Sequence, residues 1–286
     1  IVQVPDVELT FEKVLDGYAL GYHLATRGFA ANTLIGRSDR KCGAALAVYG
    51  DTQNSASGTP VAEVNMSGLY VSNLTYTIPV DGRATESVTL IGSHKTWKTS
   101  SFTVTGTIFD NADTPIALSS GLGGVQQREN VLFGTSVLPN GTNGIDGITS
   151  SGTNDKNSAG QFAVHFQGFT ISANLNRTNL LEIGRREPFF RYVNLPVEVT
   201  TEIRILSTKG DNVQATEAGI AASGNNVTEQ KIKIAMQDST IFDLGSRNKL
   251  VSSSYGGSDT GGGNALLTMT YRNFNNMVVS QNQMPG

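Results

Sequence analysis

The sequence predicts a mainly β protein, a β-barrel or β-sandwich subunit with a small flanking helix and long loops. Several segments alternate apolar and polar residues with a period of two, which is the pattern of a half-buried strand. Glycine is frequent, with 32 residues in a chain of 286, as in turn-rich β proteins. Only 16% of the residues are charged, whereas helical enzymes usually carry more Glu and Lys.

The amino-terminal segment, residues 1–60, is the least regular part of the pattern. Its short apolar clusters are interrupted by glycines, so we expect irregular structure with one short helix near Asn32 to Ser38. Strands begin at Met66. Up to Val80, one face of the predicted strand is apolar and consists of Tyr70, Leu74, Tyr76, Ile78 and Val80.

A meander of strands is expected next. The turn Asp81-Gly82 leads into a strand with Glu86, Val88 and Leu90 in phase, and a third strand is expected from Phe102 to Phe109. Residues 111–130 are predicted to form a loop with a weak helical turn, and residues 139–160 a long Gly, Asn and Ser-rich loop. A strand then covers 162–173, and the segment 174–186 predicts a short helix that ends at Gly184.

The clearest alternation is RYVNLPVEVTTEIRIL, from Arg191 to Leu206. As one strand it would span about thirteen residues, or roughly 43 Å at ~3.3 Å per residue, against a usual strand of about 5–6 residues. Pro196 lies on its polar side, and Pro79 lies on the polar side of the earlier strand. Because proline cannot donate to a ladder, we expect both at bends, bulges or strand edges. The apolar side of the segment consists of Val193, Leu195, Val197, Val199, Ile203 and Ile205.

Two further strands are expected at 231–236 and 265–271, separated by a Gly-rich loop at 256–264. We expect a single domain over residues 1–286. The hairpins 74–92 and 190–206 share Tyr, then Pro-Val-Asp/Glu, then Thr-Glu, which indicates either a pseudo-repeat or a chance similarity.

Residues that would indicate an enzyme, a metal centre or a cofactor site are not grouped. His23, His94 and His165 are far apart and lack a second ligand at metal-binding spacing. Glu198 and Glu202 would lie about 13 Å apart along a strand, whereas the two carboxyl groups of a glycosidase lie ~5–9.5 Å apart. We therefore expect no catalysis, no metal and no cofactor.

Charge and cysteine content exclude other classes. A net charge of −3 gives no electrostatic basis for tight binding to a nucleic acid backbone. Cys42 is the only cysteine, so the chain has no internal disulfide. No apolar run approaches the ~18 residues of a membrane-spanning helix, so we expect a soluble chain.

Three segments resemble the tail tube proteins, the major tail subunits of tailed bacteriophages. Residues 184–205, GRREPFFRYVNLPVEVTTEIRI, are similar to a segment of that family that reads roughly LGR-x-x-P-[FY]-[FY]-R-[FY]-V-x-[FL]-P-V-E-V-T. LTYTIPVDGRATESVTLIG, residues 74–92, and the region 243–275 are also similar. The resemblance covers the chain from about Leu74 onward.

The resemblance implies a virion structural protein that forms stacked hexameric rings, whose inner strands join into one β-barrel around the path of double-stranded DNA. Its partners would be other copies of the chain, tail terminator and baseplate or tail-tip proteins, and a sheath protein in a contractile tail. Assembly would occur in the cytoplasm of the host bacterium. Candidate lumen residues are Asp81, Glu86, Glu198 and Glu202, and candidate inter-subunit residues are Arg185, Arg186, Arg191 and Arg204, with Arg204 paired to Glu202 of a neighbour.

Two alternatives stay open at this point. A decoration or receptor-binding protein of the virion would have a similar composition but would form monomers or trimers with a ligand groove. A β-sandwich carbohydrate-active enzyme would need a close carboxylate pair and usually several exposed tryptophans, whereas Trp97 is the only tryptophan.

Overall fold

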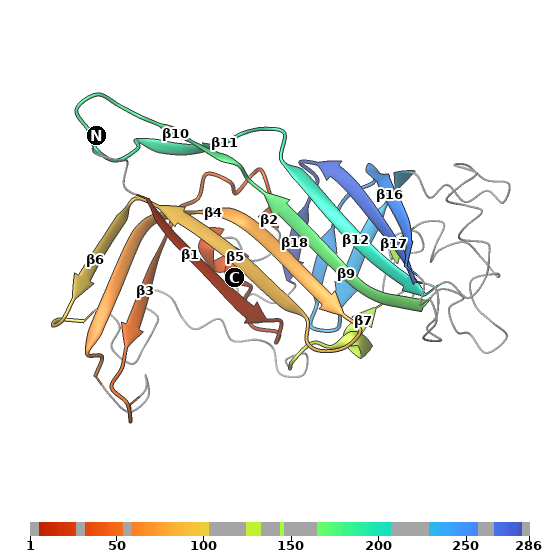
Figure 1. Cartoon of the computed structure of the whole chain (residues 1–286), viewed down its shortest axis with the longest axis horizontal. Coiled ribbons are helices and arrows are strands. Elements are labelled where there is room, and N and C mark those ends of the chain that lie inside the picture. The colour runs from red at the N-terminus through yellow and green to blue at the C-terminus, as the bar shows by residue number, and fades with distance from the viewer. Residues whose placement is uncertain are drawn as a thin grey trace, which may run out of the picture.

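The chain folds into two packed β-sheets, a two-stranded hairpin and one short helix (Figure 1). The computed structural model describes residues 6–26, 32–53, 59–102, 124–132, 144–145, 165–206, 229–256 and 266–281. The mainly β prediction is confirmed, but within these residues the sheets are open and do not close into a barrel.

The large sheet has ten strands, of which eight lie in one row. The row runs β1 (Val7–Val14), β5 (Thr85–Gly92), β4 (Ala62–Pro79), β9 (His165–Asn174), β12 (Glu198–Leu206), β17 (Leu266–Phe274), β16 (Asn248–Gly256) and β13 (Glu229–Gln230). The pairs along it are antiparallel.

An arm extends from this sheet, at the lower left of Figure 1. It consists of residues 62–67 of β4, flanked by β3 (Cys42–Val48) and β6 (His94–Lys98). The 18-residue strand β4 therefore belongs to both the large sheet and the arm. At the bend between them, Gly68 has a φ of +65°, a backbone conformation that favours glycine.

The second sheet and the helix α1 (Gly21–Thr26) lie behind the large sheet in Figure 1. The ring centroids of Tyr76 on β4 and Phe242 on β15 are 4.5 Å apart, so the two sheets share one core. The strands of the second sheet are β2 (Asn32–Thr33), β18 (Val278–Gln281), β15 (Thr240–Asp243), β14 (Ile232–Met236) and β7 (Val131–Leu132), with β8 (Gly144–Ile145) beside β14.

The prediction of one long strand from Arg191 to Leu206 is wrong. The segment forms β11 (Phe190–Val193) and β12, and the connection between them contains a cis bond between Leu195 and Pro196. The predicted apolar face is interrupted there, because Leu195 is 59% exposed. The very long strand of this fold is β4. Pro196 lies in a bend, as predicted, whereas Pro79 is the last residue of β4, a strand in the middle of the sheet and not at its edge.

The helix predicted over 174–186 is also wrong. Part of that segment is β10 (Arg177–Leu180), which pairs with β11 as a separate hairpin. The apolar residues that suggested a helix, Leu180, Leu181 and Ile183, are exposed. Residues 190–206 are not a hairpin equivalent to 74–92, because β12 pairs with β9 and β17 and not with β11.

The amino-terminal segment is more regular than predicted. It contains β1, α1 and β3, and the helix is at Gly21–Thr26, whereas residues 34–39 form turns. The alternation predicted from Met66 to Val80 is confirmed at Tyr70, Leu74, Tyr76 and Ile78, which are buried. The strands predicted at 231–236 and 265–271 are confirmed as β14 and β17.

Several predicted segments fall largely outside the described residues. They are the strand after Phe102, most of the loop 139–160, residues 257–264 of the Gly-rich loop, and the start of the strand predicted from 162. Of the segment 111–130, the described end contains a short 3₁₀ helix, η1 (Arg128–Asn130).

Candidate functional site: the hydroxyl face

The outer face of the large sheet is rich in Ser and Thr side chains, and we call this surface the hydroxyl face. It arises because β1, β5, β4, β9, β12 and β17 all alternate, with apolar residues toward the core and small polar residues outward. Thr is β-branched and favours strands, so such a face is compatible with a stable sheet. Its hydroxyl residues are Thr10, Thr75, Thr77, Thr85, Ser87, Thr89, Thr170, Ser172, Thr200, Thr268 and Thr270.

The strand register places these side chains in rows across the sheet. One row joins Thr270, Glu202, Thr170, Thr77 and Thr85 from five consecutive strands. Directly opposed residues of antiparallel strands project from the same face. The hydroxyls also bond to one another, and those of Thr10 and Thr89 are 3.0 Å apart.

A second row crosses the same five strands. It runs from Arg272 through Thr200, Ser172 and Thr75 to Ser87. The residues of both rows are half-buried by their neighbours, except Arg272, which is exposed. In Figure 1 the strands β1, β5, β4, β9 and β12 run diagonally across the front of the molecule, with α1 and the second sheet behind them.

Two of the predicted lumen carboxylates lie on the hydroxyl face, and both are in ion pairs of their own chain. Glu198 Oε1 is 2.8 Å from Arg272 Nε, and Glu202 Oε1 is 2.8 Å from Arg204 Nε. Arg204 thus already pairs with Glu202 of its own chain, and its pairing with Glu202 of a neighbour stays a prediction. These carboxylates leave little net charge on the middle of the face, and the exposed Glu8 and Glu12 lie on β1 at its edge.

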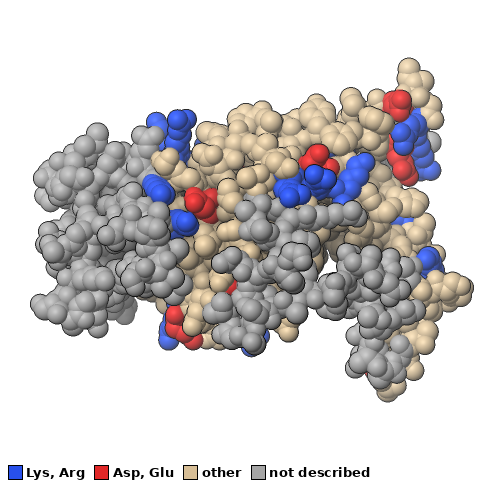
Figure 2. All heavy atoms as spheres, turned by 180° about the vertical axis from the view of Figure 1, so that it is seen from behind, with Lys and Arg blue, Asp and Glu red and all other residues tan. Residues whose placement is uncertain are grey.

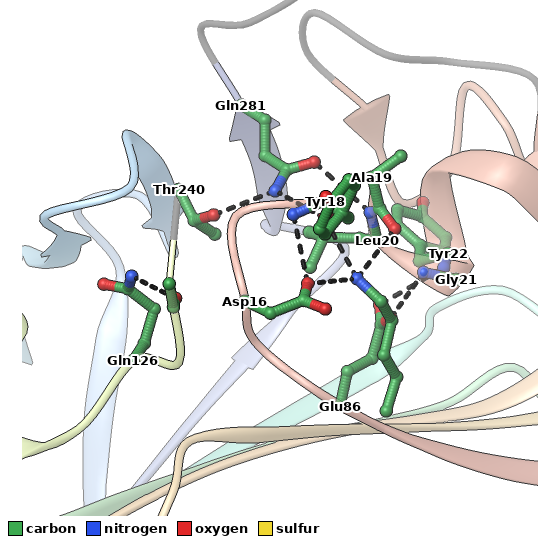
Figure 3. Close-up of polar contacts among 12 residues, drawn as sticks. Asp16, Tyr18, Ala19, Leu20, Gly21, Tyr22, Glu86, Gln126, Thr240 and Gln281 are labelled. Carbon is green, nitrogen blue, oxygen red and sulfur yellow. Dashed lines mark hydrogen bonds and ion pairs between the residues drawn. The ribbon is translucent and has the colours of Figure 1, made fainter. Parts of the chain in front are cut away.

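Glu86 was predicted to face the lumen and is instead fully buried. Its carboxylate accepts hydrogen bonds from the backbone N–H groups of Gly21 and Tyr22 and, at 2.8 Å, from the hydroxyl of Tyr76. Figure 3 shows it pointing from its strand toward the start of α1. A carboxylate there satisfies helix N–H groups that have no partner within the helix.

Burial raises the pKa of Glu86, although its three donors and Lys13 oppose the shift. The residue therefore anchors α1 to the large sheet and contributes nothing to an outer surface. The sequence contained a signal for the burial of Glu86, because this residue is in phase with Val88 and Leu90, which are both buried.

Polar residues of α1 and the loop before it are tied to the second sheet in the same way. Gln281 on β18 accepts a hydrogen bond from the Leu20 N–H and donates to the Thr240 hydroxyl (Figure 3). His23 Nε2 lies 3.1 Å from the carbonyl of Val279. Burial lowers the pKa of His23, so the imidazole is neutral at pH 7. The small flanking helix is thus a hydrogen-bonded bridge between the sheets.

The remaining predicted residues lie away from the hydroxyl face. Asp81 is in the exposed turn after β4, with a carboxylate oxygen 3.6 Å from Arg128 Nη1. Arg185 and Arg186 are exposed in the loop of the β10–β11 hairpin, where Arg185 is 3.6 Å from Glu182. Arg191 is buried on β11.

Sequence reasoning missed Arg177, which fixes the hairpin to the body of the protein. Its guanidinium donates to three carbonyls, those of Val71, Arg191 and Ser38. Burial lowers the pKa of Arg177 to about 10. Nothing in the local sequence distinguishes it from the other arginines, because two of its acceptors, the carbonyls of Val71 and Ser38, come from distant segments.

The described residues offer no evident metal site or membrane span. Within them no three His, Cys, Asp or Glu side chains gather as metal ligands would, and no helix has the length and apolarity that crossing a membrane requires. Cys42 is half-buried on β3 and, as the single cysteine of the chain, forms no internal disulfide. Figure 2 shows the molecule from behind, where charged side chains form small groups, mostly of mixed sign, between broad uncharged areas.

Comparisons with known proteins give no further assignment. No protein-family model matches the chain, and a search of curated proteins gives no match. The features that bear on the function are therefore the chemistry of the hydroxyl face and the edges of the large sheet. A surface of hydroxyls and self-neutralised ion pairs can be wetted by water but has few fixed charges with which to hold a polyelectrolyte.

Proposed function

We propose that the chain is the subunit of a tail tube of the bacteriophage kind, a virion structural protein whose rings stack into a conduit for double-stranded DNA. The observation that carries the proposal is the hydroxyl face, on which Glu198 and Glu202 are each paired with an arginine of the same chain. DNA is retained on proteins mainly by unpaired Lys and Arg. A hydroxyl surface without such a cationic array lets DNA pass.

The edges of the large sheet support assembly with other copies. β1 forms one edge and pairs only with β5 among the described strands. At the other edge, β13 covers only Asn248 and Lys249, and residues 251–256 of β16 are exposed. Unpaired edges are templates for another strand. Pairing of the β16 edge of one copy with the β1 edge of the next would extend the sheet around a ring by a head-to-tail contact.

The exposed apolar residues of the arm and hairpin suit contacts between rings. Trp97 on the arm is 64% exposed and Leu181 on the hairpin is 60% exposed. Tail terminator, baseplate or tail-tip proteins, and a sheath protein in a contractile tail, would then bind the ends and outside of the tube. On this proposal the protein is located in the virion and assembles in the host cytoplasm.

Negative-stain electron microscopy of the purified chain at low and high concentration tests the proposal. The expected result is rings with a stain-filled hole or hollow rods of uniform width. Compact monomers or trimers at every concentration would rule out a tube and favour a decoration or receptor-binding protein, which a glycan and cell-surface binding screen would then examine.

An edge variant separates assembly from folding. Val251 on β16 is 52% exposed, and Val251→Lys adds a charge to the proposed ring contact without touching the core. We expect monomers with the circular dichroism spectrum and melting temperature of the wild type. Thr96→Lys, at an exposed position of β6 away from both edges of the large sheet, is the matched control for the added charge and should leave ring closure intact.

A further inference from the structure

A cavity of about 210 Å³ lies at the bend where the arm leaves the large sheet. Its walls come from three parts of the chain: the bend itself, with Gly68 and Ser93, the residue Lys41 just before β3, and residues 185–191 at the base of the hairpin. The volume is ample for a small ion together with water. None of these residues belongs to the hydroxyl face.

One wall of the cavity is a buried cation. The side chain of Arg191 is 5% exposed, and its Nη2 donates to the carbonyl of Gly92 at 3.0 Å and to the hydroxyl of Ser93 at 2.8 Å. The same nitrogen lies 3.1 Å from Asp6, whose side chain is 71% exposed. Arg191 therefore fixes the bend while it keeps a positive charge at the cavity.

A second wall is a tyrosine whose hydroxyl has no partner. Tyr70 is 3% exposed and lines the cavity, and its hydroxyl oxygen is buried without a hydrogen bond among the described residues. A buried polar group without a partner is destabilising and rare in native proteins. A ligand that accepts a hydrogen bond in the cavity would satisfy it.

Two more cations contact the Tyr70 ring. Lys41 Nζ is 5.4 Å from its centroid, and the guanidinium carbon of Arg177 is 4.8 Å from it. Lys41 has no carboxylate within ion-pair distance in the described part of the chain. The Arg177 guanidinium donates hydrogen bonds to three carbonyls, and Asp39 supplies a negative charge near it.

Among the described residues, Lys41 is the lining cation that has no carboxylate within ion-pair distance. Arg191 lies 3.1 Å from Asp6 and Arg185 lies 3.6 Å from Glu182, while Glu187 lines the cavity 3.8 Å from His94 Nδ1. Lys41, Arg185 and Arg191 line the same space. Several cations beside a hydroxyl donor form a site for an anion with several acceptor oxygens.

We propose that this cavity binds an oxyanion, with Lys41 and Tyr70 as its direct ligands and Arg191 as the charge behind them. The oxyanion is either a free phosphate or a carboxylate that a second copy of the chain inserts at the base of the arm. The site is independent of the tube proposal, because it can be measured on the isolated chain at low concentration.

The test is a titration of the chain with inorganic phosphate at constant ionic strength, followed by melting temperature and by calorimetry. We expect phosphate to raise the melting temperature of the wild type, and Lys41→Met to weaken phosphate binding by about ten-fold or more, the scale of one charge-assisted hydrogen bond. Lys95→Met, an exposed lysine on β6 outside the cavity, should bind phosphate as the wild type does.

Tyr70→Phe distinguishes a ligand role from a structural one. The variant removes only the hydroxyl without a partner, so its melting temperature without phosphate should equal or exceed that of the wild type, while its response to phosphate should shrink. A purely structural tyrosine would instead lower the melting temperature and leave the response to phosphate unchanged.

Sedimentation of the same proteins identifies the source of the oxyanion. Direct phosphate binding to the monomer that Lys41→Met removes assigns the site to free phosphate. If the monomer does not bind phosphate, but Lys41→Met prevents self-association and phosphate competes with it in the wild type, the oxyanion is a carboxylate of a second copy. If phosphate stabilises Lys41→Met and the wild type equally, or if it affects neither stability nor association, the proposal is wrong.

Discussion

Glu86 and Glu198 occupy similar segments of the sequence and have opposite roles in the structure. Glu198 ends the element Pro196-Val197-Glu198, Glu86 follows the similar element Pro79-Val80-Asp81, and both were predicted to line an aqueous lumen. Glu198 lies on the hydroxyl face in a half-exposed pair with Arg272, whereas Glu86 is buried with three hydrogen-bond donors around it. The phase of a carboxylate relative to its apolar neighbours therefore decides its environment, more than the motif that surrounds it.

The largest expected effect comes from removing the buried member of this comparison. Glu86→Ala leaves two backbone N–H groups of α1 and the hydroxyl of Tyr76 without an acceptor, each at a cost of ~1–3 kcal/mol, so we expect a loss of about 3–5 kcal/mol in the free energy of unfolding. Urea unfolding followed by circular dichroism measures it, with Glu198→Ala as the control. Similar losses in the two variants would contradict the assigned roles.

A smaller contrast is expected between adjacent residues of β4. Leu74 is 1% exposed in the shared core, and Leu74→Ala should cost about 3 kcal/mol through lost burial and a cavity. Thr75, the next residue, faces outward, and Thr75→Ala should change the free energy of unfolding by less than about 0.5 kcal/mol in the monomer. If Thr75→Ala is as costly as Leu74→Ala, the outer face is covered by part of the chain.

The same reasoning explains how much of the fold was predictable. The strands β4, β5, β14 and β17 were found because a strict period of two needs only local sequence. The strand β1 was missed although Val7, Leu9 and Phe11 alternate with Glu8, Thr10 and Glu12, since glycines elsewhere in residues 1–60 suggested irregular structure. The helix α1 could not be placed, because its N-terminal acceptor is Glu86, 65 residues away in the sequence.

Of the candidate site, the sequence predicted that Glu198 and Glu202 would lie on a polar face, but not that Arg272 would pair with Glu198 or that Arg204 would pair with Glu202 of the same chain. Arg272 reaches Glu198 through the pairing of β12 with β17, which alternation alone does not determine. The break at Pro196 was expected as a bend but not as the end of a strand. Because the residues alternate on both sides of Pro196, two strands with different partners, β11 and β12, were predicted as one.

Two buried titratable groups at the helix α1, Glu86 and His23, should change the free energy of unfolding with pH in opposite directions. Burial raises the pKa of Glu86 above 4.5, so the folded chain keeps a proton that the unfolded chain releases, and stability relative to Glu86→Gln should rise as the pH falls through the folded pKa toward 4.5. Burial lowers the pKa of His23 below 6.5, so stability relative to His23→Gln should fall as the pH falls below 6.5.

Unfolding free energies of the wild type and the two variants between pH 4 and 8 give these differences directly. Each variant lacks one titrating group, so the slopes of the two differences against pH report Glu86 and His23 separately. Slopes of the same sign would mean that one of the two groups is not buried in solution as it is here.

The smallest effect is expected for the ion pairs of the hydroxyl face. A double-mutant cycle of Glu198→Gln and Arg272→Gln should give a coupling energy of about 0.2–1 kcal/mol, because both side chains are 43% exposed and water screens their attraction. Raising the salt concentration from 0.05 to about 0.5 M should reduce the coupling further. The contribution of this pair to function would then be electrostatic cancellation rather than stability.

Arg272→Gln leaves one carboxylate unpaired and Glu198→Gln leaves one guanidinium unpaired. If the hydroxyl face lines a DNA path, only the second variant should gain affinity for double-stranded DNA in a filter-binding assay at low salt. Equal retention of DNA by both variants would show that DNA does not contact this face.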